Sequence, residues 1–278
     1  MSNLRSRFIR DLKIRNYSDM TIRSYVNAIV GLSKYYGKCP SSISVSEIKS
    51  YLKYLTDQGK SWSTINMVHS ACNLLYGETL DQIERVQSIK RPKLPKKIPV
   101  VFSESEVVHL LSKVKNIKHK AILMTIYSAG LRCGELCHLK ITDIDSSRMR
   151  IVVRNAKGHK DREVILSRKL LDFLRYYVKQ FKPTLFLFNG QRKGMAISPR
   201  TIQKVFKRTL ERSNIQKKAS LHTLRHSYAT HLMNMGIDIR IIQQLLGHKS
   251  VKTTLIYCHL TQDRFLNTKS PLDHLNFK

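Results

Sequence analysis

Apolar residues recur at helical spacing through the first ninety residues of the chain. In residues 21–32 they fall every three or four positions. The side chain of Ser18 can accept a hydrogen bond from a free backbone N–H group at the start of such a helix. The same spacing returns in residues 44–56 and 63–76. This pattern predicts a bundle of helices whose apolar stripes meet in a core.

After residue 100 the pattern predicts helices interrupted by one pair of strands. Ser103 and Glu106 form an S-x-x-E capping box, which marks the start of a helix. Strand-like segments at residues 149–154 and 163–166 flank a turn-rich tip at 155–161, as in an antiparallel hairpin. Further helices are predicted at residues 117–129, 135–139, 170–180, 199–213, 222–235 and 238–246 and after Ser250, and a strand and turn between 185 and 199. The predicted fold class is mostly α with a small antiparallel β-sheet.

Residues 90–99 separate these two regions. They read K-R-P-K-L-P-K-K-I-P, with three prolines and five basic residues in ten positions. Proline disfavours helix and sheet, so an extended and fairly stiff connector is predicted. Five like charges repel one another unless a polyanion lies beneath them. We therefore predict a domain at residues 1–88, a basic linker at 89–100 and a second domain at 101–278.

The charge of the chain narrows the choice of partner. The sequence has 50 Lys and Arg residues against 19 Asp and Glu, a net charge of +31. Residues 1–100 hold 17 basic and 7 acidic residues, a net +10, and residues 101–278 hold 33 and 12, a net +21. Both regions therefore attract polyanions. Nucleic acid is the favoured partner, while a ribosomal-type RNA binder and a protein on an anionic membrane are the alternatives.

Cysteine usage and hydropathy bear on the compartment. The five cysteines are odd in number and scattered, and residues 1–16 are polar and charged, unlike a signal peptide. The longest uncharged apolar stretch, residues 121–131, is too short to span a bilayer. A cytoplasmic protein with no membrane partner is expected. Cys133, Cys137 and His138 have the chemistry of metal ligands, but no second pair has suitable spacing, so no metal site is predicted.

Several blocks of the sequence carry residues suited to chemistry on a phosphodiester. Residues 129–136 read A-G-L-R-C-G-E-L, residues 221–232 read L-H-T-L-R-H-S-Y-A-T-H-L, and residues 245–250 read L-L-G-H-K-S ahead of Tyr257. In this order they resemble the conserved blocks of the tyrosine recombinases, the phage-integrase and Xer-type enzymes. Lys157, in a K-G-x-K hairpin tip, matches the lysine of that family.

The resemblance implies both an architecture and a reaction. It implies an N-terminal helical core-binding domain followed by a catalytic domain. It also implies a site-specific recombinase or integrase that cleaves and rejoins double-stranded DNA through a covalent 3′-phosphotyrosyl intermediate, as a tetramer on paired sites. This chemistry needs no cofactor, and the sequence shows neither a P-loop nor an acidic cluster suited to two Mg²⁺ ions. Asp143 and Asp145, the nearest acidic candidates, are predicted to end a helix.

The matched residues have roles that suit phosphoryl transfer. Arg132 and Arg225 present planar forks to the non-bridging oxygens, and preorganised donors of this kind each contribute ~3–4 kcal/mol. His222 lies three residues before Arg225, so both can face one point. His222 is expected to be the general base for Tyr257 or a phosphate donor. His248 is expected to hydrogen-bond the same phosphate.

The remaining expectations concern the proton donor and the nucleophile. Lys157 is expected to protonate the leaving 5′-hydroxyl, although Lys160 and Arg162 are close in sequence. Tyr257, with an unperturbed pKa of ~10, is the expected nucleophile, on a short helix capped by Ser250. Glu135 is expected to anchor groups of the site.

Three other side chains in the H-x-x-R block are assigned to packing or solvent: His226, Tyr228 and His231. The tail at residues 268–275, T-K-S-P-L-D-H-L, is similar to the ending of integron integrases. The helical insertion that marks those enzymes ahead of the H-x-x-R block is missing from residues 185–220. Apolar residues beyond the nucleophile are expected to pack on a neighbouring subunit.

Other functions remain open at this point. A type IB topoisomerase would use the same chemistry without pairing two sites. A non-catalytic DNA-binding protein would use residues 237–257 as a helix-turn-helix, but it leaves the joint presence of the matched residues unexplained. An RNA-packing role accounts for the charge alone.

Overall fold

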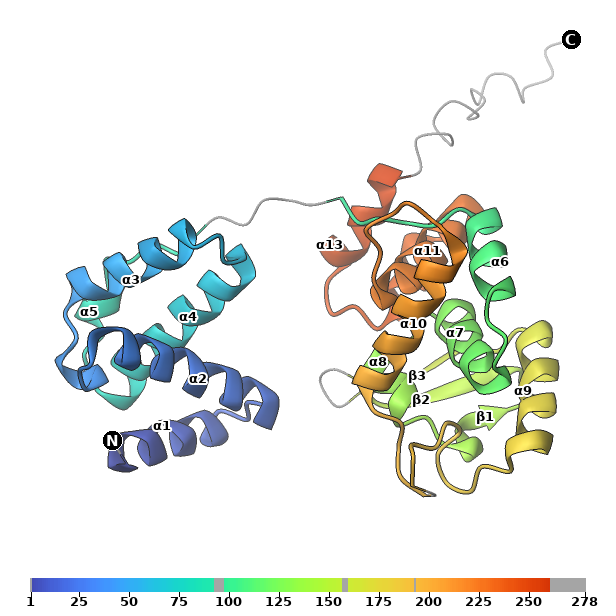
Figure 1. Ribbon diagram of the computed structural model, residues 1–278, viewed down its shortest axis with the longest axis horizontal. Coiled ribbons are helices and arrows are strands. Elements are labelled where there is room, and N and C mark those ends of the chain that lie inside the picture. The colour runs from blue at the N-terminus through green and yellow to red at the C-terminus, as the bar shows by residue number, and fades with distance from the viewer. Residues whose placement is uncertain (1, 93–97, 157–159, 193, 261–278) are drawn as a thin grey trace, which may run out of the picture. The chain divides into compact units, whose positions relative to one another are not determined.

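The computed structural model describes residues 2–92, 98–156, 160–192 and 194–260. The chain divides into two compact units, Met1–Lys96 and Lys97–Lys278 (Figure 1). Each unit has a hydrophobic core of its own.

The N-terminal unit is a bundle of helices. The helices predicted at residues 21–32, 44–56 and 63–76 are confirmed as α2, α3 and α4, and each begins at a serine whose side chain accepts a backbone N–H. Helix α1 escapes prediction because Phe8 and Leu12 are its buried side chains among those described, too few for an apolar stripe. The helices are α1 (Ser2–Ile14), α2 (Asp19–Tyr36), α3 (Val45–Asp57), α4 (Trp62–Leu74) and α5 (Glu84–Gln87), with a 3₁₀ turn at Pro40–Ser42 and a π-helical turn at Leu75–Thr79.

The C-terminal unit is mostly helical, as predicted. Helices α7 and α10 begin and end at the predicted residues, and the capping box of Ser103 and Glu106 is present. Gly130 and Gly247, both left-handed, end α7 and α12. The helices are α6 (Glu104–Ser112), α7 (Ile117–Ala129), α8 (Cys133–Cys137), α9 (Arg168–Phe181), α10 (Pro199–Ser213), α11 (Leu221–Asn234), α12 (Ile239–Leu246) and α13 (Val251–Thr254), followed by a 3₁₀ segment at Leu255–Leu260.

A three-stranded antiparallel sheet completes this unit. Its strands, in spatial order, are β1 (Ile144–Asp145), β2 (Arg150–Ala156) and β3 (Lys160–Ile165). Ile151 pairs with Val164, and Val153 pairs with Arg162. Since alternate residues of a strand share a face, Arg162 lies on the same face as the buried Val164. The sheet therefore turns one arginine inward near the hairpin tip.

Two sequence predictions need correction in this region. Asp143 does end a short 3₁₀ helix, Ile141–Asp143, and accepts a hydrogen bond from Nε of Arg154 at 2.7 Å, but Asp145 lies in β1 and ends no helix. The strand predicted between residues 185 and 199 does not form in the described part of that segment. This part pairs with other backbone at single positions only, as isolated β-bridges. The bridges join Lys140 with Phe186 and Asn189 with Ala196.

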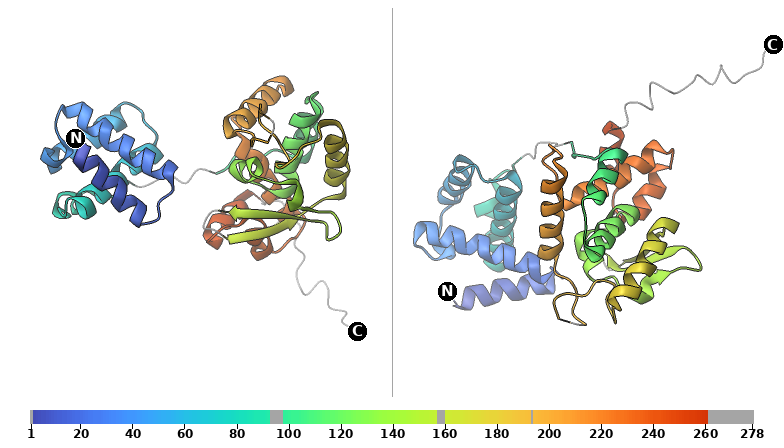
Figure 2. Two further views of the ribbon diagram at one scale, coloured as in Figure 1. Left: turned by 90° about the horizontal axis from the view of Figure 1, so that it is seen from below. Right: turned by 45° about the vertical axis from the view of Figure 1, so that its right-hand side comes forward.

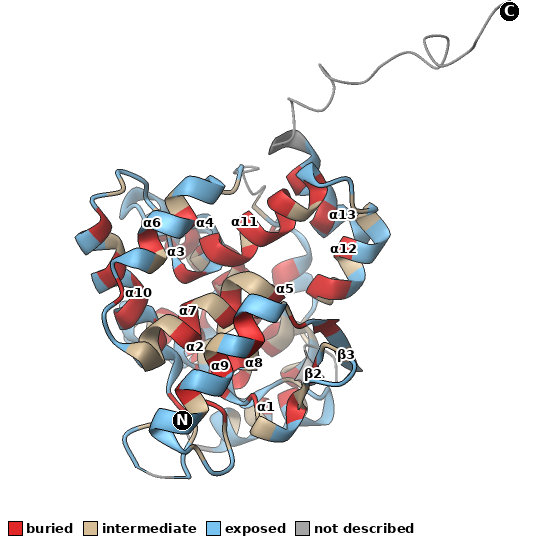
Figure 3. Ribbon diagram, turned by 90° about the vertical axis from the view of Figure 1, so that its right-hand side faces the viewer, coloured by how far each residue is buried: buried red, intermediate tan, exposed pale blue. Residues whose placement is uncertain are grey.

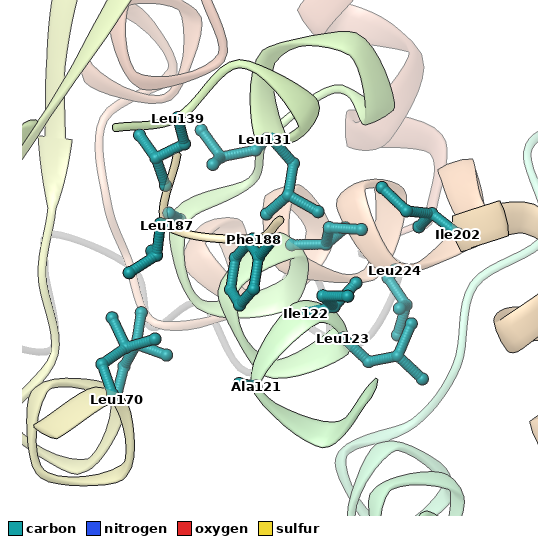
Figure 4. Packing of buried hydrophobic residues seen from close by; sticks show 14 of the residues in the cluster. Ala121, Ile122, Leu123, Leu131, Leu139, Leu170, Leu187, Phe188, Ile202 and Leu224 are labelled. Carbon is teal, nitrogen blue, oxygen red and sulfur yellow. The ribbon is translucent and has the colours of Figure 1, made fainter. Parts of the chain in front are cut away.

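Helix α7 is the centre of the C-terminal unit. It contacts α8, α9, α11 and β3, and α12 in turn contacts α11 and β3 (Figure 2). Buried residues follow the inner faces of these elements (Figure 3). Phe188 packs among Ile122, Leu131 and Leu187 at the middle of the core (Figure 4). This packing brings the end of α7, the start of α11 and the end of α12 together. None of the helices in the described ranges is long and apolar enough to cross a membrane.

Gly130, at the end of α7, is expected to tolerate no side chain. Its φ is 59°, and an added Cβ would lie 2.5 Å from Cδ1 of Tyr228. We expect Gly130→Ala to lower the free energy of unfolding of this unit by about 2–4 kcal/mol. A side chain is unfavourable on a left-handed backbone, and the added methyl group would also overpack against Tyr228. Denaturant titration measures the loss. Gly134→Ala is the matched control, since no described atom lies within 4 Å of its Cβ; an equal loss there would contradict the prediction.

Candidate active site

Three arginines surround one carboxylate at the junction of α7 and α8. After Gly130, the buried Leu131 fixes the chain, and Arg132 stands at the N-terminus of α8. Glu135, one turn later, accepts the backbone N–H of Arg132 and its Nη1, both at 2.8 Å. The start of α8 thus fixes the direction of the first predicted arginine.

Arg162 and Arg225 complete this cluster. Arg162 donates from Nη1 and Nη2 to the two oxygens of Glu135, each at 2.8 Å, and Nη1 of Arg225 lies 3.8 Å from Oε2. The side chains of Arg225, Glu135 and Arg162 are 2%, 7% and 10% exposed. With Arg132 the four side chains carry a net charge of +2, in a site where little water screens it. Burial alone would raise the pKa of Glu135, but hydrogen bonds from Arg162 and Arg132 hold it at about 2. The anchoring role expected for Glu135 agrees with these contacts.

The last carbonyls of α12 hold the same three arginines. Carbonyls at a helix C-terminus lack partners within the helix and carry partial negative charge. The pairs are Arg162 Nε with Leu245 O at 2.9 Å, Arg225 Nη2 with Leu246 O, and Arg132 Nη2 with Gly247 O at 3.2 Å. Arg225 also donates to Gly130 O at the end of α7. Two helix ends and one carboxylate therefore fix all three guanidinium groups.

Tyr257 lies just beyond α13, in the 3₁₀ segment and not on the predicted short helix itself. Ser250 caps α13 as predicted, and four α-helical residues then tighten into 3₁₀ turns. The Tyr257 side chain is buried in a small cluster with Tyr228 and Leu246. Burial raises the pKa of Tyr257, and the positive charges of Arg225 and Arg132 oppose that rise. These two charges thus act on the phenol.

The hydroxyl of Tyr257 lies 2.9 Å from Nδ1 of His226. His226, assigned from the sequence to packing or solvent, is therefore a hydrogen-bond partner of the phenol. His222, the predicted general base, lies one turn earlier on α11, is exposed, and has its ring 5.7 Å from that of His226. The ring of His248 lies nearly parallel to that of Tyr257 with the ring centres 6.5 Å apart, and its Nδ1 makes a hydrogen bond with Oγ1 of Thr254 at 2.9 Å. The structure thus places His226 and His248 beside the phenol, and His222 beside His226.

Two site residues were missed by sequence reasoning, and each left a signal. Arg162 is in phase with the buried Val164 on β3 and with Leu166 just after the strand, so an arginine occupies a core-facing position. His226 lies four residues after His222, so the two share a helix face. Neither signal identifies the site by itself, because each becomes informative only when the element packed against that face is known.

The other residues singled out from the sequence either have structural roles or lie outside the described residues. His231 bonds the hydroxyl of Tyr127 and the carbonyl of Phe102, both at 2.9 Å, in agreement with packing. Lys157 and the tail at 261–278 lie outside the described residues. In the part of the chain that is described, no group of three His, Cys, Asp or Glu residues is placed to hold a metal ion.

Comparison with known families assigns both units. The phage integrase family matches residues 100–264, and the phage integrase N-terminal SAM-like domain matches residues 4–84. The chain belongs to the phage integrase family. It is a tyrosine recombinase, and its helical N-terminal unit and mixed C-terminal unit confirm the predicted fold class.

Similar proteins match nearly the full chain. Putative integrase/recombinase y4qK of Sinorhizobium fredii is 37% identical over 277 residues, 99% of this chain and 90% of that protein. Tyrosine recombinase XerA of Pyrococcus horikoshii is 35% identical over 264 residues, 94% and 90% of the two chains. The crystal structure of the XerH site-specific recombinase bound to palindromic difH substrate, a post-cleavage complex, has a TM-score of 0.75 at 22% identity and covers 95% of this chain and 83% of that one. The fold is thus shared along the chain.

The histidines beside Tyr257 should make the catalytic unit of this recombinase sensitive to acid. Desolvation, with nearby His222 and Arg225, lowers the pKa of His226 to about 4, and desolvation with the arginines does the same for His248. Their pKa is ~6.5 in an unfolded chain, so unfolding takes up protons, and stability is lost as pH falls from about 6.5 to 4. We expect denaturant titrations to show this slope, and His226→Asn to flatten it. An unfolding free energy that is constant over this window would contradict the assignment.

Proposed function

We propose that this tyrosine recombinase attacks DNA with Tyr257 and holds the scissile phosphate between Arg132 and Arg225. The observation that carries the proposal is the buried Tyr257 phenol: burial raises its pKa, and the charges of the same two anchored guanidinium groups, Arg225 and Arg132, act against that rise. A guanidinium has five N–H donors. The bonds that each arginine makes to Glu135 or to helix-end carbonyls therefore leave donors for phosphate oxygens.

The proposed reaction exchanges one phosphoester for another. The Tyr257 oxygen attacks phosphorus, the bond from phosphorus to the 5′ oxygen breaks, and the leaving 5′ oxygen takes a proton, which we assign to Lys157, to become a 5′-hydroxyl. Guanidinium groups fixed in advance stabilise charge on the five-coordinate phosphorus at ~3–4 kcal/mol each. The 3′-phosphotyrosyl bond keeps the ester energy, so attack by a 5′-hydroxyl rejoins the strand without ATP.

His222 and His248 are proposed to bind the same phosphate. His222 shares a face of α11 with Arg225, three residues away, and its exposed ring is open to an incoming strand. His248 directly follows the carbonyls at the end of α12 that hold the arginines. Both imidazoles are thus next to the guanidinium groups that define the phosphate position.

The substrate that we propose is double-stranded DNA, bound by both units. The net charge of +31 favours it, and binding should weaken steeply with salt because bound Lys and Arg release counterions. In this proposal residues 1–88 bind the core site, residues 89–100 cross the DNA as a basic strap, and residues 101–278 are catalytic. The family matches at residues 4–84 and 100–264 support these boundaries.

We also propose that the active form is a tetramer on two paired sites. Recombination of two duplexes breaks four strands, and each subunit contributes one nucleophile. Matches to integrases favour sites on a mobile element. All five cysteines are free thiols, which agrees with the cytoplasm as the place of reaction.

A suicide substrate tests the proposal: a duplex nicked next to the cleavage position, carrying the sequence that flanks the gene. We expect a covalent protein–DNA adduct whose peptide map places the DNA 3′ end on Tyr257. Supercoiled plasmid that lacks the site should stay supercoiled. Relaxation of such a plasmid would favour the type IB topoisomerase reading, and an adduct on another residue would refute the assignment of Tyr257.

A further inference from the structure

The hydroxyl of Tyr257 has a proton acceptor of its own inside the protein. His226, on α11, places Nδ1 2.9 Å from the phenolic oxygen, and the two rings lie 5.7 Å apart at 50°. That distance is within the range of a direct hydrogen bond. Arg225, the residue before His226, is fixed by the ends of α7 and α12. The turn of α11 that carries His226 is therefore held by the ends of two other helices.

The other two histidines of the site have different neighbours. His222 is exposed, and its ring neighbour among the described residues is His226, not the phenol. His248 already has Nδ1 in a hydrogen bond with Thr254, and its ring lies nearly parallel to that of Tyr257 with the ring centres 6.5 Å apart. The hydrogen bond that the described residues make to the phenolic hydroxyl comes from His226. His226 is thus the histidine whose nitrogen points at the phenolic oxygen.

We propose that His226 is a catalytic residue whose Nδ1 takes the proton of Tyr257 as the phenolic oxygen attacks phosphorus. The proposal rests on the assignment of Tyr257 as nucleophile. In the forward step the O–H bond of Tyr257 breaks, its oxygen bonds to phosphorus, the proton moves to Nδ1, and the 5′ oxygen leaves with a proton from Lys157. In religation the attacking 5′-hydroxyl gives its proton back to Lys157 and His226 returns its proton to the phenolic oxygen, so the enzyme ends each cycle unchanged.

The electrostatics of the site support a neutral acceptor. Desolvation, followed by His222 and Arg225, holds the pKa of His226 at about 4, so at neutral pH the ring carries no charge. With its one proton on Nε2, Nδ1 is free to accept. A phosphate bound to Arg132 and Arg225 cancels positive charge beside the ring and raises this pKa toward the operating pH, where general-base catalysis is most effective. The acceptor thus becomes a stronger base when DNA is in place.

The test combines a change of the histidine with a change of the phenol. His226→Asn places an amide oxygen near the position of Nδ1 and keeps a hydrogen bond, but it cannot take up a proton. A fluorinated tyrosine introduced at position 257 has a more acidic phenol and depends less on a base. Single-turnover cleavage of the suicide substrate by the full chain is measured for the four combinations, with DNA binding and thermal unfolding as checks of folding.

With the natural tyrosine, we expect His226→Asn to slow cleavage by ~10²–10⁴-fold, the usual worth of a general base. With the fluorinated tyrosine, the loss caused by the same substitution should shrink at least tenfold. His222→Ala should lose activity equally with either phenol, because it is assigned to the phosphate. Cleavage by His226→Asn at the normal rate, or an equal loss with both phenols, would overturn the proposal. An adduct that forms in Tyr257→Phe would instead overturn the nucleophile assignment, so the two failures are distinguishable.

Discussion

Tyr257→Phe is expected to abolish formation of the covalent protein–DNA adduct. The substitution removes the oxygen that we propose attacks phosphorus, and loss of a nucleophile lowers turnover by on the order of 10⁶-fold in a well-studied hydrolase. The remaining phosphate-binding groups do not supply a replacement. Time courses on the suicide substrate, resolved on denaturing gels, measure the adduct directly.

Binding and folding should survive this change. The Tyr257 hydroxyl makes its described hydrogen bond with His226, and loss of one such bond is worth about 0.5–1.5 kcal/mol of stability. Mobility-shift titration should therefore give a similar affinity for duplex DNA. Tyr228→Phe is the matched control, because Tyr228 is buried in the same cluster and its hydroxyl has no hydrogen-bond partner among the described residues. Full cleavage by Tyr228→Phe with none by Tyr257→Phe is the expected pair; adduct formation by Tyr257→Phe would refute the mechanism.

The elements with a regular apolar stripe or clear end signals were predictable from sequence. Helix α7 runs between an Asn N-cap and Gly130, and α10 begins at Pro199 after Ser198, so local chemistry marks the ends of both. Helix α1 has no such signal, since its polar face is wide and its few buried side chains depend on tertiary contacts. The bridges around Phe186 likewise depend on a partner segment far away in sequence.

The residues of the site could be predicted only where they belong to a recognisable sequence motif. Arg132 and Arg225 were found, and the structure brings them to one carboxylate. Arg162 was considered only as a residue close in sequence to Lys157, because sequence spacing does not show which face of a strand meets α12. His226 was assigned to packing, because the bend from α13 into the 3₁₀ segment decides which histidine faces Tyr257.

The end of α12 explains why these parts occur together. Three successive carbonyls bind three arginines that come from α8, β3 and α11, and the chain then continues through His248 to Tyr257. A Cβ at Gly247 would lie 3.0 Å from Cδ of Arg162, on a left-handed backbone. The glycine therefore ends the helix and leaves room for the arginine. One helix terminus thus positions the two arginines that we propose bind the phosphate, and the chain leads from it to the proposed nucleophile.

Glu135→Gln is expected to be the most destabilising single change in this cluster. It leaves Arg132, Arg162 and Arg225 close together without the carboxylate that compensates them, and breaking a buried ion pair by removing one partner costs about 3–5 kcal/mol. Cleavage should fall as well, since the arginine forks lose the group that orients them. The single tryptophan, Trp62, lies in the N-terminal unit, so hydrogen exchange in α7 peptides is the suitable measure of unfolding.

The same substitution should also change the response to strong acid. The pKa of Glu135 falls from 4.5 to about 2 on folding, so its contribution is complete above pH 4.5 and is lost as pH falls toward 2. This difference corresponds to about 3 kcal/mol. Glu135→Gln should lack that loss, whereas the earlier loss between pH 6.5 and 4, which belongs to the histidines, should remain. Glu163→Gln is the matched control, because Glu163 pairs with Arg148 at 3.0 Å on the exposed surface, where such pairs contribute about 0–1 kcal/mol. Equal effects of the two substitutions would show that Glu135 does not balance the arginines.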